Sequence, residues 1–209
     1  MYFNRKCKIT FISHGATIYS EEGRISESEN YPPLSELGIE EVESLTKFLK
    51  SRAVKNDVIY TSPAVRTRQS AMMISKLFKK DYVVVDDLTS RRLGQWNGMT
   101  IGQILEKYPD GIQDLLLHPD KNVDSVVEAS DEFVARIKTV IDRLVEENVG
   151  NRIIIVTYPD VIQAAICGAL GIPADKLSKI FIRTGSATQI TYFEKWSSLV
   201  YSDHVPLQV

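Results

Sequence analysis

The residues of this chain best able to do chemistry each follow a short apolar run. They are His14, Ser62 and Tyr158, and each lies within two residues of the end of its run. Histidine exchanges a proton near neutral pH and can also act as a nucleophile. Taken alone, a histidine after a strand is more often a loop or cap residue than a catalyst. An arginine such as Arg66, in the first turn of a helix, usually faces solvent. Their arrangement in the fold must therefore decide between these interpretations.

The apolar runs before these residues predict the strands of one sheet. We expect strands at residues 8–12, 57–61, 82–85, 152–156 and 187–193. Because predicted helices separate most of these strands, the pattern favours a mainly parallel sheet that is covered on both faces. Ligands of such sheets bind beyond the carboxyl ends of the strands, where the three polar residues lie.

Helices are predicted from their caps and from apolar residues at three- and four-residue spacing. Ser35 is the expected N-cap of the first helix, whose buried stripe consists of Ile39, Val42, Leu45 and Leu49. A second helix is expected to start at residues 62–63, with Pro63 in its first turn. Further helices are expected at residues 100–108, 131–147 and 159–171.

Two segments lack a clear period. Residues 17–33 are polar and contain paired prolines, so we expect a long loop there. Residues 88–130 are expected to form an inserted lobe. The pattern assigns no structure to the residues from 197 onward.

The composition of the 209 residues fits one domain with a buried core, since 44% are hydrophobic and 25% are charged. A formal net charge of −2 argues against a nucleic-acid surface. No signal peptide or membrane span is predicted, so we expect a cytoplasmic protein with no membrane partner. Cys7 and Cys167 have neither disulfide nor metal spacing and are expected to be small core residues.

Short motifs follow one another in order from residue 13 to residue 186. The first is Ser-His-Gly-Ala-Thr at 13–17, and Gly-Arg-Ile follows at 23–25. The others are PLSELG at 33–38, TSPAVRTRQSA at 61–71, LTSRRLGQWNG at 88–98, IIIVTYPDVIQAA at 153–165, GIP at 171–173 and GS at 185–186. Together, and in this order, they resemble the signatures of the histidine phosphatase superfamily, the phosphoglycerate-mutase-like enzymes.

The resemblance implies a fold and a chemistry. The implied fold is one α/β domain, a three-layer sandwich with a mixed, mostly parallel sheet and helices on both faces, in which residues 88–130 form a cap over the site. The implied nucleophile is His14, and the implied phosphate-binding residues are Arg66, Thr17 and Arg24. The implied ligand is phosphate or a phosphorylated small molecule, with no metal or cofactor. A homodimer is compatible with this interpretation.

Three positions differ from the pattern of the family. Ser13 stands where the family has an arginine, Tyr158 where it has a second histidine, and Ser90 where it has a glutamate. The transition state of phosphoryl transfer spreads negative charge over its oxygens, so preorganised donors contribute most of the rate. Losing a cation, an imidazole and an acid predicts a slow or inactive pocket.

Nearby cations could replace the missing arginine. Arg24, Arg91, Arg92 and Arg183 are the candidates, and the alternative is that all four are solvated surface residues.

Three functions follow from these residues. The first is a catalytically impaired family member, a pseudoenzyme, that still binds a phosphorylated ligand. The second is an active phosphomonoester hydrolase or mutase that works through a phosphohistidine at His14 with a rearranged donor set. The third is a non-catalytic interaction module.

Overall fold

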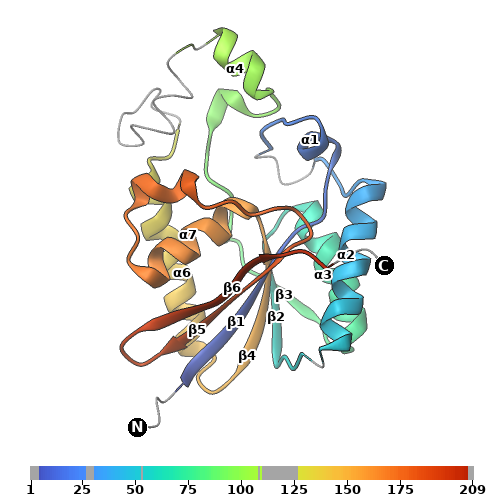
Figure 1. The fold of residues 1–209 in the computed structure, drawn as a ribbon, viewed down its shortest axis with the longest axis vertical. Helices are drawn as coiled ribbons and strands as arrows, with labels where there is room; N and C mark the ends of the chain where they lie inside the picture. The colour runs from blue at the N-terminus through green and yellow to red at the C-terminus, as the bar shows by residue number, and fades with distance from the viewer. Residues whose placement is uncertain (1–4, 27–30, 53, 108, 110–126, 207–209) are drawn as a thin grey trace.

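The computed structural model describes residues 5–26, 31–52, 54–107, 109 and 127–206. A six-stranded sheet with the strand order β3-β2-β4-β1-β5-β6 forms its centre (Figure 1). The strands are β1 (Arg5–Ser13), β2 (Val58–Thr61), β3 (Tyr82–Val84), β4 (Arg152–Thr157), β5 (Ala187–Phe193) and β6 (Ser197–His204). The first four are parallel, whereas β5 is antiparallel to both β1 and β6. The sheet is therefore mixed and mostly parallel, as the sequence predicts.

Helices cover both faces of this sheet, which confirms the expected three-layer sandwich. Figure 1 shows α2 (Glu36–Ser51) and α3 (Val65–Phe78) on one side, and α6 (Ser130–Glu147) and α7 (Pro159–Leu170) on the other. The shorter elements are α1 (Ile18–Glu21), η1 (Gly94–Trp96), α4 (Ile101–Lys107) and η2 (Ala174–Lys179). Within the described residues, no helix is long and apolar enough to cross a membrane.

Strand β4 shows why both faces can be covered. Ile153 and Ile155 belong to the hydrophobic cluster that includes α6 and α7, while Ile154 and Val156 belong to the cluster that includes α2 and α3. Alternate residues of a strand point to opposite faces, so a continuous apolar run supplies two cores at once. This arrangement buries β4 near the middle of the sheet and fixes the position of the residue that follows it, Tyr158.

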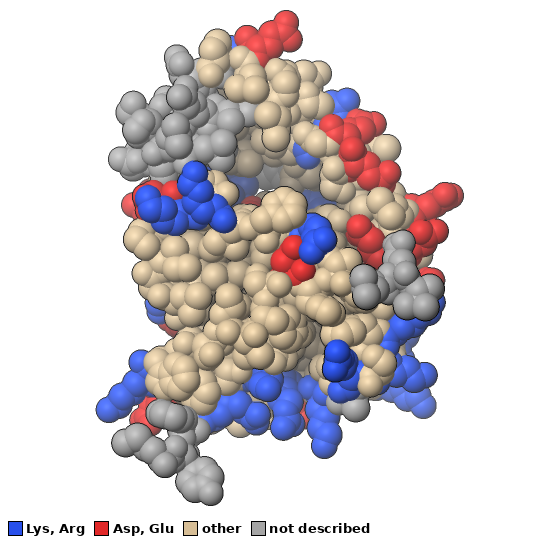
Figure 2. Space-filling model, viewed as in Figure 1, with Lys and Arg blue, Asp and Glu red and all other residues tan. Residues whose placement is uncertain are grey.

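The carboxyl ends of β1, β2 and β4 meet at one edge of the sheet. The His14 amide donates to the Thr157 carbonyl oxygen at 3.0 Å, and the Ser62 amide donates to the Val156 carbonyl oxygen at 3.0 Å. Segments α1 and α4 lie beyond this edge (Figure 1), and Figure 2 shows a hollow between them and the body of the molecule. His14, Ser62 and Tyr158 therefore come together where the sequence predicts a site.

The prediction of a long loop at residues 17–33 is wrong in part, because α1 lies within it. Thr17 begins this helix as a capping box: its Oγ1 accepts from the Ser20 amide at 3.2 Å, and Ser20 Oγ accepts from the Thr17 amide at 2.8 Å. Part of the predicted loop, residues 27–30, lies outside the described residues. The capping pair is Thr-x-x-Ser, which is a weaker sequence signal than Ser or Thr followed by an acidic residue.

Two details of the helix predictions are also wrong. Ile39 is 42% exposed, and the buried stripe of α2 is Gly38, Val42, Leu45 and Leu49. Packing at the N-terminal end of α2 occurs through the backbone of Gly38, which a search for apolar side chains overlooks. The second helix begins at Val65 with Ala64 as its N-cap, so Pro63 precedes the helix rather than occupying its first turn.

The edges of the sheet account for the remaining differences. The unassigned C-terminal residues form β6, in which no residue is buried and Val200 and Ser202 are exposed, so no buried face marks it. Val83 and Val84 of the edge strand β3 are 51% and 40% exposed, although their apolar run resembles a buried strand. Cys7 and Cys167 are buried free cysteines, as predicted.

The inserted segment is described in part. The helix expected at residues 100–108 is α4, while Tyr108 and residues 110–126 lie outside the described residues. Ser130 already belongs to α6. The cap over the site at residues 88–130 therefore stays a prediction.

Candidate active site

A cavity of about 250 Å³ opens at the carboxyl ends of the parallel strands. It is lined by six of the seven predicted site residues, namely His14, Thr17, Arg24, Arg66, Ser90 and Tyr158. The other lining residues are Ser20, Ile25, Ser26, Arg91, Leu93, Pro159, Asp160 and Thr184. These residues come from segments that are far apart in the sequence, so the folded chain alone brings them together.

The loop that carries His14 is held from three sides. The Gly15 amide donates to Ser70 Oγ of α3 at 3.2 Å, and the Ala16 amide donates to Glu41 Oε2 of α2 at 2.7 Å. The His14 carbonyl oxygen accepts from the Gly185 amide at 2.9 Å. Hydrogen bonds from α3, from α2 and from the turn before β5 therefore fix the position of the histidine backbone.

The imidazole of His14 has a defined tautomer. Its Nδ1 lies 2.7 Å from the Gly15 carbonyl oxygen, which can only accept a hydrogen bond, so Nδ1 carries the proton. Burial, reinforced by the positive charge of Arg66, lowers the pKa of His14 to about 3 against the opposing effect of the Gly15 hydrogen bond. At neutral pH the ring is uncharged, and Nε2 keeps the lone pair that a nucleophile requires.

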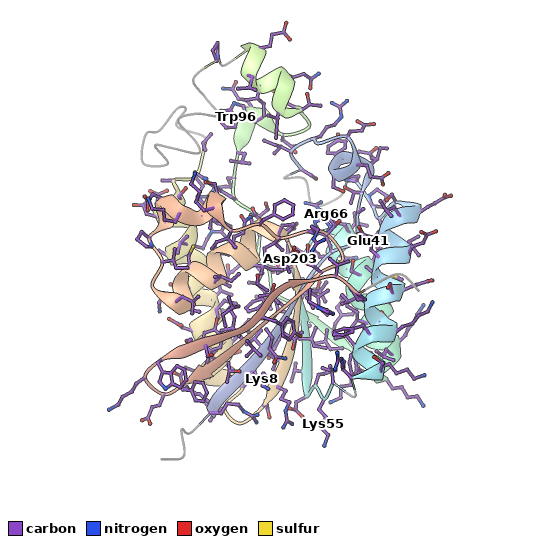
Figure 3. All side chains as sticks on the ribbon, viewed as in Figure 1. Lys8, Glu41, Lys55, Arg66, Trp96 and Asp203 are labelled. Atoms are coloured by element: carbon purple, nitrogen blue, oxygen red, sulfur yellow. The ribbon has the colours of Figure 1, made fainter. Side chains whose placement is uncertain are left out.

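Arg66 provides a buried positive charge beside this ring. Its side chain is 1% exposed, and its Nη2 donates to the Ser26 carbonyl oxygen at 3.1 Å. The guanidinium carbon lies 4.9 Å from the centre of the Tyr158 ring, which in turn meets the His14 ring edge-on at 5.9 Å. Burial lowers the pKa of Arg66, but a guanidinium remains charged at neutral pH. Figure 3 shows Arg66 and Glu41 toward one end of the sheet and Lys8 and Lys55 toward the other.

Thr17 and Arg24 lie in the cavity wall with other contacts of their own. Thr17 Oγ1 caps α1, as described above, and the residue is 1% exposed. Arg24 Nη1 donates to the Gly98 carbonyl oxygen at 3.0 Å, and Arg24 Nε forms an ion pair with Glu22. The Arg24 side chain remains 31% exposed, so it can reorient at low cost.

Ser13 is the one predicted site residue that does not line the cavity. It is fully buried at the end of β1, and its amide donates to the Ser186 carbonyl oxygen at 3.0 Å. Its Oγ has no hydrogen-bond partner among the described residues. A serine at this position therefore faces the interior of the fold.

The other candidate arginines divide into two groups. Arg91 lines the cavity, is 7% exposed and donates from Nε to the Glu128 carbonyl oxygen at 2.7 Å. Arg92 lies outside the cavity beside Glu128, and Arg183 is held at 2.8 Å by Asp203 Oδ2. The prediction that the four are solvated surface residues is thus wrong for Arg91.

A carboxylate that the sequence analysis did not single out also lies in the wall. Asp160, in the first turn of α7, accepts at Oδ2 from Ser90 Oγ at 2.5 Å and from the Arg91 amide at 2.8 Å. Its position two residues after Tyr158 and directly after a proline looks like an ordinary acidic first turn. The signal that could have identified it is its proximity, in the fold, to the position where Ser90 replaces an acid.

The arrangement suits chemistry on an anion. It combines a neutral imidazole, a buried guanidinium and two further arginines at the wall of one cavity. Within the described residues no group of three or more His, Cys, Asp or Glu side chains is placed to hold a metal ion.

Known proteins share the sequence pattern and the fold of this chain. Residues 9–203 match the histidine phosphatase superfamily (branch 1). The chain is 24% identical over 169 residues to phosphoserine phosphatase 1 of Hydrogenobacter thermophilus, an alignment that covers 81% of this chain and 79% of that protein.

Two solved structures illustrate the likeness of the fold. YhfR of Bacillus stearothermophilus superposes with a TM-score of 0.86 at 22% identity, covering 95% of this chain and 98% of that one. Phosphoserine phosphatase of Entamoeba histolytica, solved in complex with 3-phosphoglyceric acid, gives a TM-score of 0.83 at 19% identity, with 95% and 98% covered. The sheet topology agrees with this likeness, and the sequence match extends over nearly the whole chain. The chain therefore belongs to the histidine phosphatase superfamily, branch 1.

Proposed function

We propose that this chain is a phosphomonoester hydrolase that works through a phosphohistidine at His14. The observation that carries the proposal is the state of His14: its Nδ1 proton is held by the Gly15 carbonyl oxygen, so the lone pair is on Nε2. The ring also lines the same cavity as Arg66. A neutral, oriented nucleophile beside a fixed cation is what phosphoryl transfer requires.

The proposed reaction consists of two displacements at phosphorus. The Nε2 lone pair attacks phosphorus, the ester P–O bond breaks, and the leaving oxygen takes up a proton. Arg66, Thr17 and Arg24 bind the phosphoryl oxygens, with Arg91 at the wall as the added cation of a rearranged donor set. Water next attacks phosphorus, the P–N bond breaks, and phosphate and neutral His14 are released.

The substrate class we propose is a phosphorylated small molecule. A cavity of about 250 Å³ holds a phosphate and a few more atoms. The relatives support this class, since they include phosphoserine phosphatases and a structure with bound 3-phosphoglyceric acid. We also propose that residues 88–130 cap the site within a single domain, since Ser90, Arg91 and Leu93 already contribute to its wall.

A second candidate is an impaired member of the family that binds a phosphorylated ligand without turning it over. Ser13 favours it, because no cation occupies the position directly before His14, and so does Tyr158, which is neutral where the family has a histidine. The distinction between the two candidates is a matter of rate, because binding of the phosphate group requires the same cavity in both.

Trapping the intermediate separates these candidates. The purified chain would be mixed with p-nitrophenyl phosphate and a panel of phosphorylated small molecules, quenched, and analysed by mass spectrometry for phosphohistidine. We expect turnover and phosphorylation of His14, both abolished in His14→Ala. The impaired candidate would be favoured if the chain binds inorganic phosphate in a thermal-shift assay, yet forms no phosphohistidine and hydrolyses none of the substrates.

A further inference from the structure

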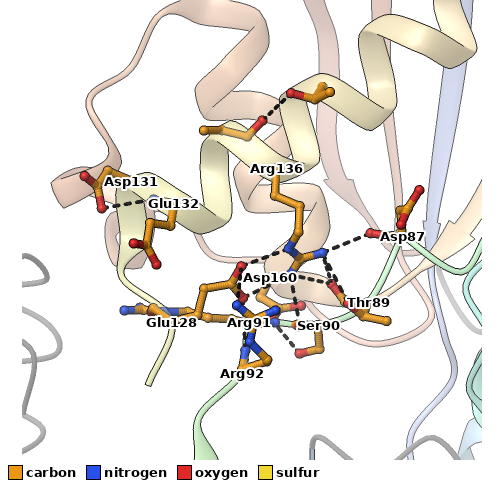
Figure 4. Close-up of polar contacts among 12 residues, drawn as sticks. Asp87, Thr89, Ser90, Arg91, Arg92, Glu128, Asp131, Glu132, Arg136 and Asp160 are labelled. Carbon is orange, nitrogen blue, oxygen red and sulfur yellow. Dashed lines mark hydrogen bonds and ion pairs between the residues drawn. The ribbon is translucent and has the colours of Figure 1, made fainter. Parts of the chain in front are cut away.

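Ser90 and Asp160 form a hydrogen-bonded pair in the cavity wall. Ser90 Oγ lies 2.5 Å from Asp160 Oδ2, which also accepts from the Arg91 amide (Figure 4). Asp160 Oδ1 accepts from the amide of Val161 at 2.8 Å. Both residues line the cavity with His14. A hydroxyl with a carboxyl directly behind it thus faces the space in which His14 would attack.

The pKa values of the carboxyl groups of Glu128 and Asp160 are shifted in opposite directions. Glu128 has a side chain that is 1% exposed and accepts from Arg136 Nε at 2.8 Å and Nη2 at 3.0 Å. Burial opposes its ionisation, but these bonds and the Arg92 amide outweigh burial and lower the pKa of Glu128. Burial raises the pKa of Asp160, against the hydrogen bonds from Ser90, Arg91 and Val161.

This contrast assigns the roles. Neighbouring titratable groups whose pKa values are pushed apart commonly mark the acid of a site. Glu128 is held by Arg136 and does not line the cavity, whereas Asp160 lines it beside Ser90 and has a pKa that burial raises.

We propose that Ser90 and Asp160 together deliver the proton that the leaving-group oxygen takes up, with the Ser90 hydroxyl as donor and Asp160 as its proton source. The proposal rests on the proposed hydrolase function. It also gives a physical reason why Ser90 can stand where the family has a glutamate: the carboxyl has moved to the first turn of α7, and the serine hydroxyl bridges the distance to the substrate.

The proton transfers balance. As Nε2 of His14 bonds to phosphorus and the ester P–O bond breaks, the leaving oxygen takes the Ser90 Oγ proton and Oγ takes the proton of Asp160 Oδ2. The alcohol leaves, and Asp160 is a carboxylate. When water attacks the phosphohistidine, the water oxygen bonds to phosphorus as the bond from phosphorus to His14 Nε2 breaks. Ser90 Oγ takes a proton from this water and passes its own proton to Asp160 Oδ2, which restores the starting state.

Charged groups from each neighbouring element act on Asp160. Arg66 of α3 stabilises the carboxylate that forms during the reaction, and Arg91 contributes from the segment before η1. His14, which follows β1, is neutral. Glu128, just before α6, and Asp131, in the first turn of α6, act electrostatically on Arg91. The positive charges of Arg66 and Arg91 oppose the rise in the pKa of Asp160, so its carboxyl group can still donate a proton.

Leaving-group dependence tests this proposal. An acid matters for an alkyl phosphate, whose alkoxide leaves poorly, and matters little for p-nitrophenyl phosphate, whose phenolate leaves without a proton. We expect Asp160→Asn and Ser90→Ala to lower kcat/KM for an alkyl phosphate by about 100-fold or more, and for p-nitrophenyl phosphate by less than about 10-fold. Ser90→Thr, which retains the hydroxyl, should keep most of the alkyl phosphatase activity.

The pH profile and a matched control complete the experiment. Wild-type kcat/KM for the alkyl phosphate should fall as pH rises through the pKa of Asp160, and Asp160→Asn should lack this limb. Glu41→Gln is the control: Glu41 is another half-buried carboxylate that holds a backbone amide and whose pKa burial raises, but it does not line the cavity. Glu41→Gln should change kcat/KM by the same factor for both substrates.

The outcomes are distinguishable. If wild type turns over both substrates and Asp160→Asn lowers both equally, Asp160 is structural and this proposal is overturned, while the hydrolase function stands. If wild type hydrolyses neither substrate and no phosphohistidine forms at His14, the proposed hydrolase function is wrong. The proposed proton-donor role of Ser90 and Asp160 is then wrong as well.

Discussion

Gly15 and Gly38 pack backbone against backbone. A Cβ placed on Gly15 would lie 2.1 Å from the Gly38 carbonyl oxygen, and a Cβ placed on Gly38 would lie 2.0 Å from the Ala16 carbonyl oxygen. Side chains essentially never approach a backbone so closely, so neither position admits one without a shift of the chain. The first turn of α2 therefore sets the position of the loop that carries His14.

Gly38→Ala should displace this loop. Because both obstructing groups are backbone, we expect a loss of about 1–3 kcal/mol in the free energy of unfolding, together with a drop in kcat/KM. Urea denaturation and steady-state kinetics measure the two effects. Gly102→Ala in α4 is the control, since its nearest obstructing atom is Thr100 Oγ1 at 3.8 Å. Equal behaviour of the two variants would refute the tight packing.

Arg66→Lys should retain the positive charge but lower kcat/KM. The planar fork of arginine binds two phosphoryl oxygens, whereas an ammonium group contacts them as a point charge. We expect kcat/KM for p-nitrophenyl phosphate to fall by about 10²–10³-fold, the usual loss for one preorganised donor. Arg183→Lys, at a residue held by Asp203 outside the cavity, should stay within about twofold of wild type. A lysine variant with wild-type kinetics would remove Arg66 from the site.

His14 should make the fold sensitive to acid. Its pKa is about 3 in the folded chain and 6.5 for an unperturbed histidine, so the unfolded chain binds the proton first as pH falls. Stability is therefore fully present above about pH 6.5 and is lost as pH falls toward 3, by up to about 1.4 kcal/mol per pH unit. Urea denaturation of wild type and His14→Gln at several pH values should show a steeper acid loss for wild type. Parallel curves would contradict a neutral, buried His14.

Tyr158→His should raise activity. The imidazole can donate to a phosphoryl oxygen in the position where the family has its second histidine, and adding one preorganised donor is worth up to about 10²-fold in rate. Tyr158→Phe is the matched control, because it keeps a ring beside Arg66 and lacks both hydroxyl and imidazole. Burst and steady-state kinetics with p-nitrophenyl phosphate give the comparison. If the histidine variant is no faster than the phenylalanine variant, Tyr158 does not limit the rate.

Predicting the sheet from the sequence works where burial is complete. Residues 153–156 are apolar and buried on both faces of β4, and the prediction of a strand there needs no other information. By contrast, no residue of β6 is buried, and Val83 and Val84 of the edge strand β3 are exposed, so their burial does not follow the hydrophobic pattern. Hydrophobic periodicity predicts contacts made by side chains. It misses Gly38 because the backbone of Gly38 packs against the loop that carries His14.

The sequence predicts several residues that line the cavity, but it does not predict the hydrogen bonds between them. Ordered motifs are sufficient to bring His14, Arg66 and Tyr158 together, because each follows or adjoins a strand that ends at the same edge. Asp160 lies 70 residues from Ser90 in the sequence. Their contact depends on how α7 and the segment before η1 meet in space, which no local pattern encodes.

The position of β1 in the sheet has a consequence for synthesis of the chain. Its two neighbours are β4 and β5, and both follow it by well over a hundred residues. At about 5–20 residues per second, a ribosome needs roughly 7–30 s to make the intervening polypeptide. During that interval the apolar strand that ends at His14 lacks both hydrogen-bonding neighbours. Nascent chains truncated before residue 152 should therefore expose an unpaired apolar strand of the kind that promotes aggregation.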